Sequence, residues 1–220
     1  MLRTIILNML MELISIKSCR VSVSLYFAVF IACMLVLDNT GLTIFALLCA
    51  AFHEMGHIVT ISALKVPVCE ISFKLFGINI KLRNNIMLSF KQEILIALSG
   101  CIANALLCIV SLIAINIHFY SFYANYIFIF SLFIAGFNII PITPLDGGRA
   151  LTAYLNTHFQ CHTVEKITNV LSFFFIVPLG VMGFFLLIKT GYNFSLIATA
   201  LYLAVTLIFK RDMFIKKAKA

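Results

Sequence analysis

Long apolar blocks follow one another along almost the whole sequence and leave few folds open to it. Only 11% of the residues are charged and 63% are hydrophobic, whereas about a quarter of the residues in an average soluble domain carry a charge. A soluble fold cannot hide so much apolar surface from water. Because no polar linker separates the blocks, we predict a single membrane domain.

Six of these blocks are long enough to cross about 30 Å of hydrocarbon. They predict an all-α polytopic membrane protein with six transmembrane helices, at about residues 21–37, 42–61, 94–117, 123–142, 168–188 and 194–209. Apolar residues at helical spacing within 2–16 predict an amphipathic helix in the membrane interface. The expected organisation is therefore an interfacial segment over 1–19, the six-span domain over 20–209 and a basic tail over 210–220.

The basic residues predict an orientation for these six spans. With the N-terminus in the cytoplasm, 15 of the 16 Lys and Arg residues lie inside and only Lys189 lies outside, as the positive-inside rule requires. We therefore expect both termini to be cytoplasmic. The net charge of +8 is divided among short clusters between the blocks, so no nucleic-acid partner is expected.

Between the second and third blocks, apolar and polar residues alternate over 71–82, with an interruption at Phe76-Gly77. This pattern predicts a short β-hairpin between the second and third spans. Two roles stay open for it. It is either a cytoplasmic connector with one face on the membrane or an edge strand that binds substrate.

The segment from His53 to His57 has the pattern H-E-x-x-H and lies inside a predicted helix. Residues four apart share a helix face, so the two imidazoles can converge on one ion, while Glu54 can hold and deprotonate the water that the ion polarises. An ionisable side chain within a bilayer costs on the order of 3 kcal/mol or more, which points to a function for these three. The alternative is that they only satisfy one another inside a helix bundle.

A catalytic zinc usually takes a third protein ligand. His118 falls in the predicted outer loop, and His158 and His162 fall in a polar connector. Asp146 is the better candidate, because it lies where the fourth block re-emerges at the depth of His57, in a segment that two prolines and two glycines break. The alternative for this segment is a turn that only ends a helix.

These two segments, His53–His57 and Asn138–Gly148, resemble the signature motifs of the site-2 proteases, the intramembrane zinc metalloproteases. The N-P-D-G element of that family is present in expanded form in the second segment. The stretch Ser99–Asn104 is similar to the family's G-x-x-x-N motif. The resemblance covers about residues 20–209 and is strongest to the compact branch that includes the stage IV sporulation protease FB.

The resemblance implies a role for each matching residue. Glu54 is the implied catalytic base and acid. The implied ligands of one Zn²⁺ per chain are His53, His57 and Asp146, and the implied substrate-positioning residues are Asn138 and Pro144. Many members of this branch append a nucleotide-sensing CBS domain, whereas about eleven residues follow the sixth block here, so we expect no regulation by nucleotide.

The implied function is regulated intramembrane proteolysis near the cytoplasmic face of a bacterial cell membrane. The implied partners are the lipid bilayer, a membrane-embedded or membrane-associated substrate and a potential inhibitory membrane protein. A sigma-factor precursor in sporulation is one expected substrate, and anti-sigma factors or signal-peptide remnants are the alternative. A different class of protein is also open, namely a polytopic transporter that uses the His and Asp residues as an ion site.

Overall fold

The computed structural model describes residues 12–16, 19–74, 77–82, 88–119, 121–191 and 194–218. The chain divides into two compact units, one of Met1–Leu88 with Ala103–Leu132 and one of Ser89–Ile102 with Phe133–Ala220. The elements, in chain order, are β1 (Glu12–Ile16), β2 (Cys19–Val23), α2 (Leu25–Leu37), α3 (Leu42–Ala63), β3 (Val68–Lys74), β4 (Gly77–Leu82), α4 (Phe90–Asn116), α5 (Ser121–Asn138), α6 (Asp146–Leu155), α7 (Cys161–Thr190) and α8 (Ser195–Ala218).

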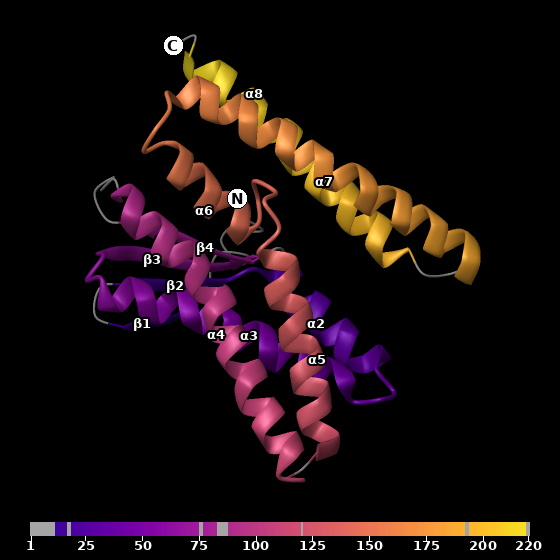
Figure 1. Ribbon diagram of the computed structural model, residues 1–220. Helices are drawn as coiled ribbons and strands as arrows, with labels where there is room; N and C mark the ends of the chain where they lie inside the picture. The colour runs from indigo at the N-terminus through magenta and orange to yellow at the C-terminus, as the bar shows by residue number, and fades with distance from the viewer. Residues whose placement is uncertain are drawn as a thin grey trace, which may run out of the picture. The chain divides into compact units, whose positions relative to one another are not determined.

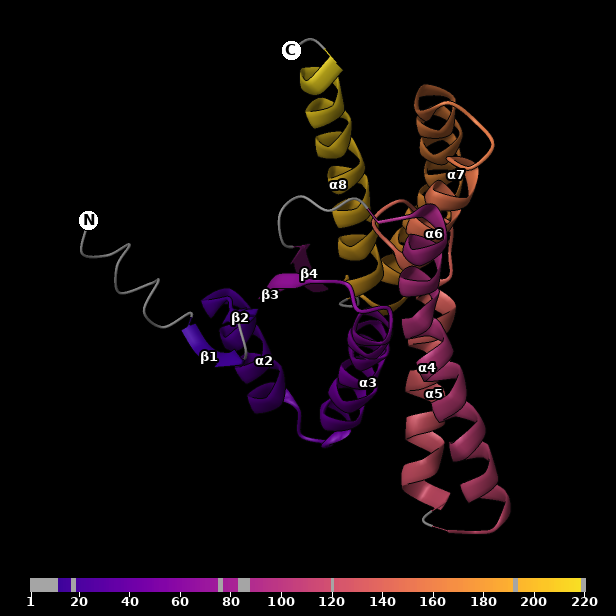
Figure 2. The same cartoon turned by 90° about the vertical axis from the view of Figure 1, so that its left-hand side faces the viewer.

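The first unit contains a four-stranded sheet with the strand order β1-β2-β3-β4 (Figure 1). The pairs β1–β2 and β3–β4 are antiparallel, and the central pair β2–β3 is parallel. A parallel pair needs a crossover connection, which α2 and α3 provide through the short turn that joins them (Figure 2). Among the described strands, β4 lies at an edge of the sheet, and an edge strand can pair with a further strand.

The predicted fold class, an all-α polytopic membrane protein with six transmembrane helices and a short β-hairpin between the second and third, is wrong. Residues 71–82 belong to β3 and β4, which are half of a mixed sheet that β1 and β2 extend. The first predicted span, 21–37, begins inside β2, and only the 13 residues of α2 are helical. At 1.5 Å per residue such a helix is about 20 Å long, which is short of the hydrocarbon thickness of about 30 Å.

Three helices of the described chain, α3, α4 and α7, are long and apolar enough to cross a membrane. The segments Phe27–Leu37, Phe122–Asn138 and Ser195–Ile208 are apolar but shorter. Three candidate spans therefore replace the predicted six. The chain is still a membrane protein by the length and composition of these helices.

The side chains are distributed as expected for contact with lipid. Large apolar groups face outward on α7, where Val170 is 71% exposed and Phe174 is 67% exposed. Polar side chains are inside, since Asn104, Ser131 and Ser172 are each 0% exposed. Water would penalise such a large apolar surface, whereas lipid tails do not.

The structure tests the predicted interfacial helix over only part of its length. Residues 1–11 and 17–18 lie outside the described residues, so a helix there stays a prediction. Glu12–Ile16 is strand β1, and for these residues the prediction of a helix is wrong. At the other end of the chain, the predicted basic tail over 210–220 continues α8 as helix up to Ala218.

In the first unit, contacts of α3 and α4 with α5 hold the helices together. The Cys49 thiol of α3 donates to the carbonyl oxygen of Ile127 at 3.7 Å, and the Cys108 thiol of α4 donates to that of Phe128 at 3.7 Å. The rings of Phe45 and Tyr123 stack with their centroids 5.6 Å apart. These contacts fix which face of α3 turns inward.

In the second unit, α7 and α8 lie side by side (Figure 1). The core of this unit is formed by Ile142, Ile176 of α7 and Leu203 of α8, which are at most 7% exposed. Ile142 precedes α6, so the irregular segment between α5 and α6 packs against the α7–α8 pair. Residue Thr143 adds a polar contact there, because its N–H donates to the Ser172 hydroxyl at 3.0 Å.

Candidate metal centre

The two histidines of the H-E-x-x-H motif lie on the buried face of α3. His53 is 4% exposed and His57 is 7% exposed, and Cys49 and Ile61 are buried at the same four-residue spacing. The imidazole centroids are 5.0 Å apart, with the rings nearly perpendicular. Glu54 follows His53 directly and is half-buried. The helix period thus places both imidazoles on one face, as predicted.

A carboxylate at the preceding turn holds the first turn of this helix. Asp38 accepts hydrogen bonds from the backbone N–H of Thr40 at 2.8 Å and of Thr43 at 2.7 Å. Donation from the Thr40 hydroxyl and then from the Thr43 and Thr40 N–H groups holds the pKa of Asp38 well below its usual range. The turn also needs Gly41, whose φ is 73°, a value that suits glycine.

One polar side chain of the same unit reaches the first histidine. Asn104 of α4 is 0% exposed, and its Nδ2 atom lies 3.5 Å from Nδ1 of His53. The other end of that amide, Oδ1, is buried without a hydrogen-bond partner. Buried polar atoms usually have a hydrogen-bond partner, so a buried Oδ1 atom without one is unusual.

Asp146 is the first residue of α6 in the second unit and is 7% exposed. A carboxylate is stabilised at this place, because the N-terminal end of a helix carries a partial positive charge. The Arg149 guanidinium, one turn on, has its Nη1 atom 3.8 Å from Oδ1 of Asp146. In the sequence, Arg149 counted only among the 15 basic residues expected in the cytoplasm, so this contact was not predicted.

The backbone before Asp146 is irregular because prolines interrupt it. After α5 ends at Asn138, the N–H of Ile142 donates to the carbonyl of Ile140 at 2.8 Å, and that of Leu145 donates to Ile142 at 2.8 Å. Pro141 and Pro144 have no N–H to continue a helix. The chain therefore turns twice within a few residues before α6 begins.

Two glycines let this irregular segment pack onto α6. A Cβ atom on Gly147 would lie 2.1 Å from the carbonyl oxygen of Ile139, and one on Gly148 would lie 2.1 Å from that of Ile142. Both obstacles are backbone atoms, which cannot move aside as a flexible side chain would. The Gly-Gly pair after Asp146 is therefore a packing requirement.

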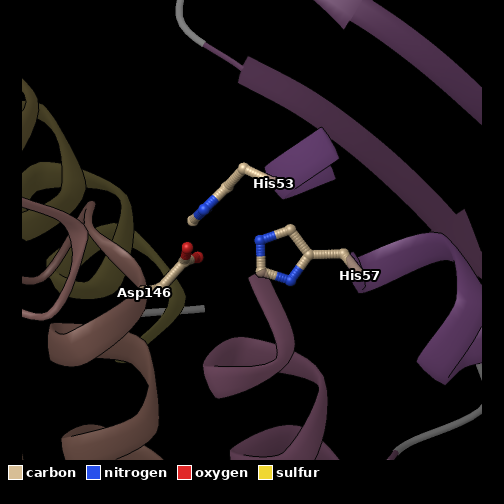
Figure 3. A group of neighbouring side chains, drawn as sticks. All are labelled: His53, His57 and Asp146. Atoms are coloured by element: carbon tan, nitrogen blue, oxygen red, sulfur yellow. The ribbon is translucent and has the colours of Figure 1, made fainter. Parts of the chain in front are cut away.

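The three predicted ligands are divided between the two units, with His53 and His57 in the first and Asp146 in the second. Each of the three side chains is buried and offers one atom that can bind a metal ion, either an imidazole nitrogen or a carboxylate oxygen. Figure 3 shows these side chains, with His53 and His57 extending from α3 and Asp146 from the start of α6. Two imidazole nitrogens and a carboxylate oxygen are the donor types that Zn²⁺ takes in catalytic sites, so the donor set fits this metal. Their action as ligands stays a prediction.

The two predicted substrate-positioning residues lie in the second unit. The Asn138 amide donates to the carbonyl of Ile134 in its own helix at 3.0 Å. Pro144 is exposed and lines a cavity of about 300 Å³. The other lining residues of this cavity are Glu93, Thr143, Arg149, Thr152, Thr206 and Leu207.

Sequence reasoning gave no site role to several residues that the structure connects with the motifs. Asn104 was noted only as part of a family motif, yet it is the neighbour of His53. Ser172 was not singled out, although it binds the backbone three residues before Asp146. The spacing of three between Asp146 and Arg149 was a usable signal. The contacts of Asn104 with His53 and of Ser172 with Thr143 join residues far apart in the sequence, so no local pattern indicates them.

Comparison with known proteins gives two findings. The model of peptidase family M50 matches residues 114–179, a segment that contains Asn138–Gly148 but not His53–His57. Among solved structures, the site-2 protease from Methanocaldococcus jannaschii is similar, with a TM-score of 0.57 and 21% identity over 87% of this chain and 90% of that chain. No curated protein sequence matches the chain.

The solved structure, at this level of identity, establishes a shared fold, and the family match adds the segment around Asp146. Neither finding singles out the compact sporulation branch. Both findings agree with the resemblance of this chain to the site-2 proteases, the first over residues 114–179 and the second in the fold.

Proposed function

We propose that the protein is an intramembrane zinc metalloendopeptidase that carries out regulated intramembrane proteolysis. The observation that carries the proposal is the H-E-x-x-H helix, where His53 and His57 share one buried face of α3 with their ring centroids 5.0 Å apart. The family match around Asp146 supports it as well. When bound by these residues, zinc would polarise the peptide carbonyl and lower the pKa of water.

Glu54 is the proposed general base and acid. It adjoins His53 on α3 and is half-buried, so water can reach its carboxylate while the neighbouring imidazole stays inside. The carboxylate would take the proton of the attacking water and then give it to the leaving amine. Glutamine at this position would keep the shape of the side chain but would lose the proton transfer.

The substrate is proposed to enter beside Asp146. The cavity of about 300 Å³ is lined by Pro144, Glu93 and Arg149, and thus offers both signs of charge around a proline that cannot donate a backbone hydrogen bond. An extended polypeptide can bind to such a surface. Asn138 lies in the same unit, before the irregular segment that leads to Asp146. A sigma-factor precursor in sporulation is the proposed substrate, with anti-sigma factors or signal-peptide remnants as the alternative. An inhibitory membrane partner is also proposed.

Two variants of the purified protein test the proposal. Glu54→Gln should lower peptide cleavage by at least about 10²-fold while zinc content stays near wild type. Asp146→Asn should lower zinc affinity by more than the roughly 10–100-fold typical of losing an outer-shell partner, and cleavage should fall with it. Full cleavage by Glu54→Gln would reject the proposal. A protein that moves ions without cutting any peptide would be the transporter instead.

We also propose that both termini lie in the cytoplasm of a bacterial cell. In the second unit, Arg149 and Lys166 lie near the start of α7 and Lys189 near its end. Because α8 packs along α7, its C-terminal end lies toward the start of α7, and the sequence is rich in Lys and Arg from residue 210 onward. Cytoplasmic ends of spans carry an excess of Lys and Arg, which favours a cytoplasmic start for α7.

The orientation predicts the reactivity of Cys161, the exposed first residue of α7. A membrane-impermeant thiol reagent should modify it in inverted vesicles and not in intact cells. Cys161→Ser is the control, since it removes the labelled site without touching the proposed ligands. Labelling from outside intact cells would reverse the proposed orientation.

A further inference from the structure

Asn104 presents an amide whose two ends face different surroundings. Its Nδ2 atom lies 3.5 Å from Nδ1 of His53, and its Oδ1 atom is buried without a hydrogen-bond partner. The side chain is 0% exposed. A buried carbonyl oxygen without a donor is unfavourable. In this arrangement Oδ1 of Asn104 has no donor, although the neighbouring His53 ring can donate a hydrogen bond.

A half-turn of the amide about its Cβ–Cγ bond gives the oxygen a donor and moves the amide nitrogen to the side where the oxygen had none. The nitrogen and oxygen ends of an asparagine side chain have nearly the same shape, and their assignment follows from the hydrogen bonds they can make. The half-turn places Oδ1 next to Nδ1 of His53 without moving α3 or α4. The ring then donates from Nδ1, and the buried oxygen gains its partner.

The direction of this hydrogen bond decides which ring nitrogen keeps a lone pair. A neutral imidazole carries one proton, so an Asn104 N–H donating to Nδ1 would put the proton on Nε2. With Oδ1 as the acceptor, the proton is on Nδ1 and the lone pair is on Nε2. Metal-binding histidines commonly donate their second ring N–H to an oxygen in this way.

We propose that Asn104 is a positioning residue for the metal centre. Its carbonyl oxygen accepts a hydrogen bond from Nδ1–H of His53 and thereby presents Nε2 of that ring to the metal. The inference rests on the proposed zinc site but adds a residue on a second helix of the same unit. Asn104 touches His53 and acts only through it.

The first experiment measures metal affinity of the full chain in detergent, with Zn²⁺ alone in competition with a chromophoric chelator. Asn104→Leu keeps the size of the side chain and loses the acceptor, so its dissociation constant should rise about 10–100-fold. Asn104→Asp keeps an acceptor oxygen and should stay within about threefold of wild type. Asn116→Leu is the matched control, because Asn116 lies on the same helix and donates to its own backbone at Leu112.

The outcomes separate this inference from the proposed function. If wild type binds Zn²⁺ and Asn104→Leu binds it equally well, the positioning role is overturned while the zinc site stands. Wild type that binds no Zn²⁺ overturns both. Cleavage activity is not needed for either decision.

A second measurement needs no Asn104 variant and therefore does not depend on how such a variant folds. Histidine-selective ¹⁵N NMR of the zinc-loaded wild type, with His53 assigned through His53→Gln, reports the state of each ring nitrogen. The proton is expected on Nδ1 and the metal on Nε2. Metal ligation through Nδ1 would overturn the inference, because the Asn104 oxygen would then have no donor.

Discussion

The helix that carries the histidines and the segment that carries Asp146 are built in opposite ways. On α3, a spacing of four residues puts His53 and His57 on one buried face, and local hydrogen bonds suffice for that. Before Asp146 the backbone turns irregularly and is held by Gly148 and Ser172 through contacts with other parts of the chain. One half of the candidate centre depends on local helix geometry, and the other half depends on close tertiary packing.

The largest effect should come from filling the space at Gly148. In Gly148→Ala the new Cβ atom would overlap the carbonyl group of Ile142, which neither chain segment can avoid without moving. Such overpacking lowers the free energy of unfolding by about 3 kcal/mol. We expect a lower midpoint of thermal unfolding in detergent, together with loss of bound zinc and of cleavage.

Gly136 of α5 provides the control for that substitution. A Cβ atom there would meet nothing within 4 Å, and alanine is a better helix former than glycine. Gly136→Ala should therefore unfold at or above the wild-type midpoint. Equal behaviour of the two alanine variants would show that the close packing at Gly148 does not matter.

A smaller effect is expected from removing the hydroxyl of Ser172. In Ser172→Ala the buried N–H of Thr143 loses its acceptor, and an unsatisfied buried donor costs about 1–3 kcal/mol. The free energy of unfolding should fall by that amount, and zinc affinity should weaken because the segment before Asp146 is less well held. Chemical denaturation and chelator competition would measure the two changes.

Ser111 of α4 is the matched control for Ser172. It is also buried, but its hydroxyl donates only to the carbonyl of Leu107 in its own helix. That carbonyl is already within a helix, so Ser111→Ala strands no backbone donor and should change stability by at most a few tenths of a kcal/mol. If Ser111→Ala lowered the free energy of unfolding as much as Ser172→Ala, burial of the hydroxyl, and not the contact with Thr143, would account for the loss.

The smallest effect concerns the turn before α3. Asp38→Asn should speed amide exchange at Thr40 and Thr43 while zinc affinity stays at the wild-type level, because the two imidazoles lie several turns away. Since the folded-state pKa of Asp38 is lowered, its contribution is complete above about pH 4 and is lost as the pH falls further. Amide hydrogen exchange followed at neutral pH would detect the change, and a loss of bound zinc would contradict it.

The same contrast explains what the sequence could and could not predict. The H-E-x-x-H helix and the break around Asp146 leave local patterns, and both were located from the residues alone. The sheet was only half anticipated, because β1 and β2 are five residues each and adjoin an apolar block. The predicted interfacial helix covered β1, and the first predicted span covered part of β2. The parallel pairing of β2 with β3 joins residues that are too far apart in the sequence to form a local pattern.

The approach of Asn104 to His53 was equally invisible, since it joins residues 51 positions apart. A family motif marked Asn104 without giving its partner. The number of spans was overestimated for a related reason. Hydropathy measures how apolar a block is, whereas the ends of a helix depend on strands, prolines and turns within the block.

The parallel pairing of β2 with β3 limits when the sheet can form during synthesis of the chain. Ribosomes deliver β2 before α2 and α3, but the parallel pair of β2 with β3 cannot form until β3 has emerged after both helices. The histidine helix is therefore synthesised before the sheet beside it can close, and α6 with Asp146 follows later still. With the proposed ligand set, a nascent chain therefore lacks its third metal ligand until α6 has been synthesised.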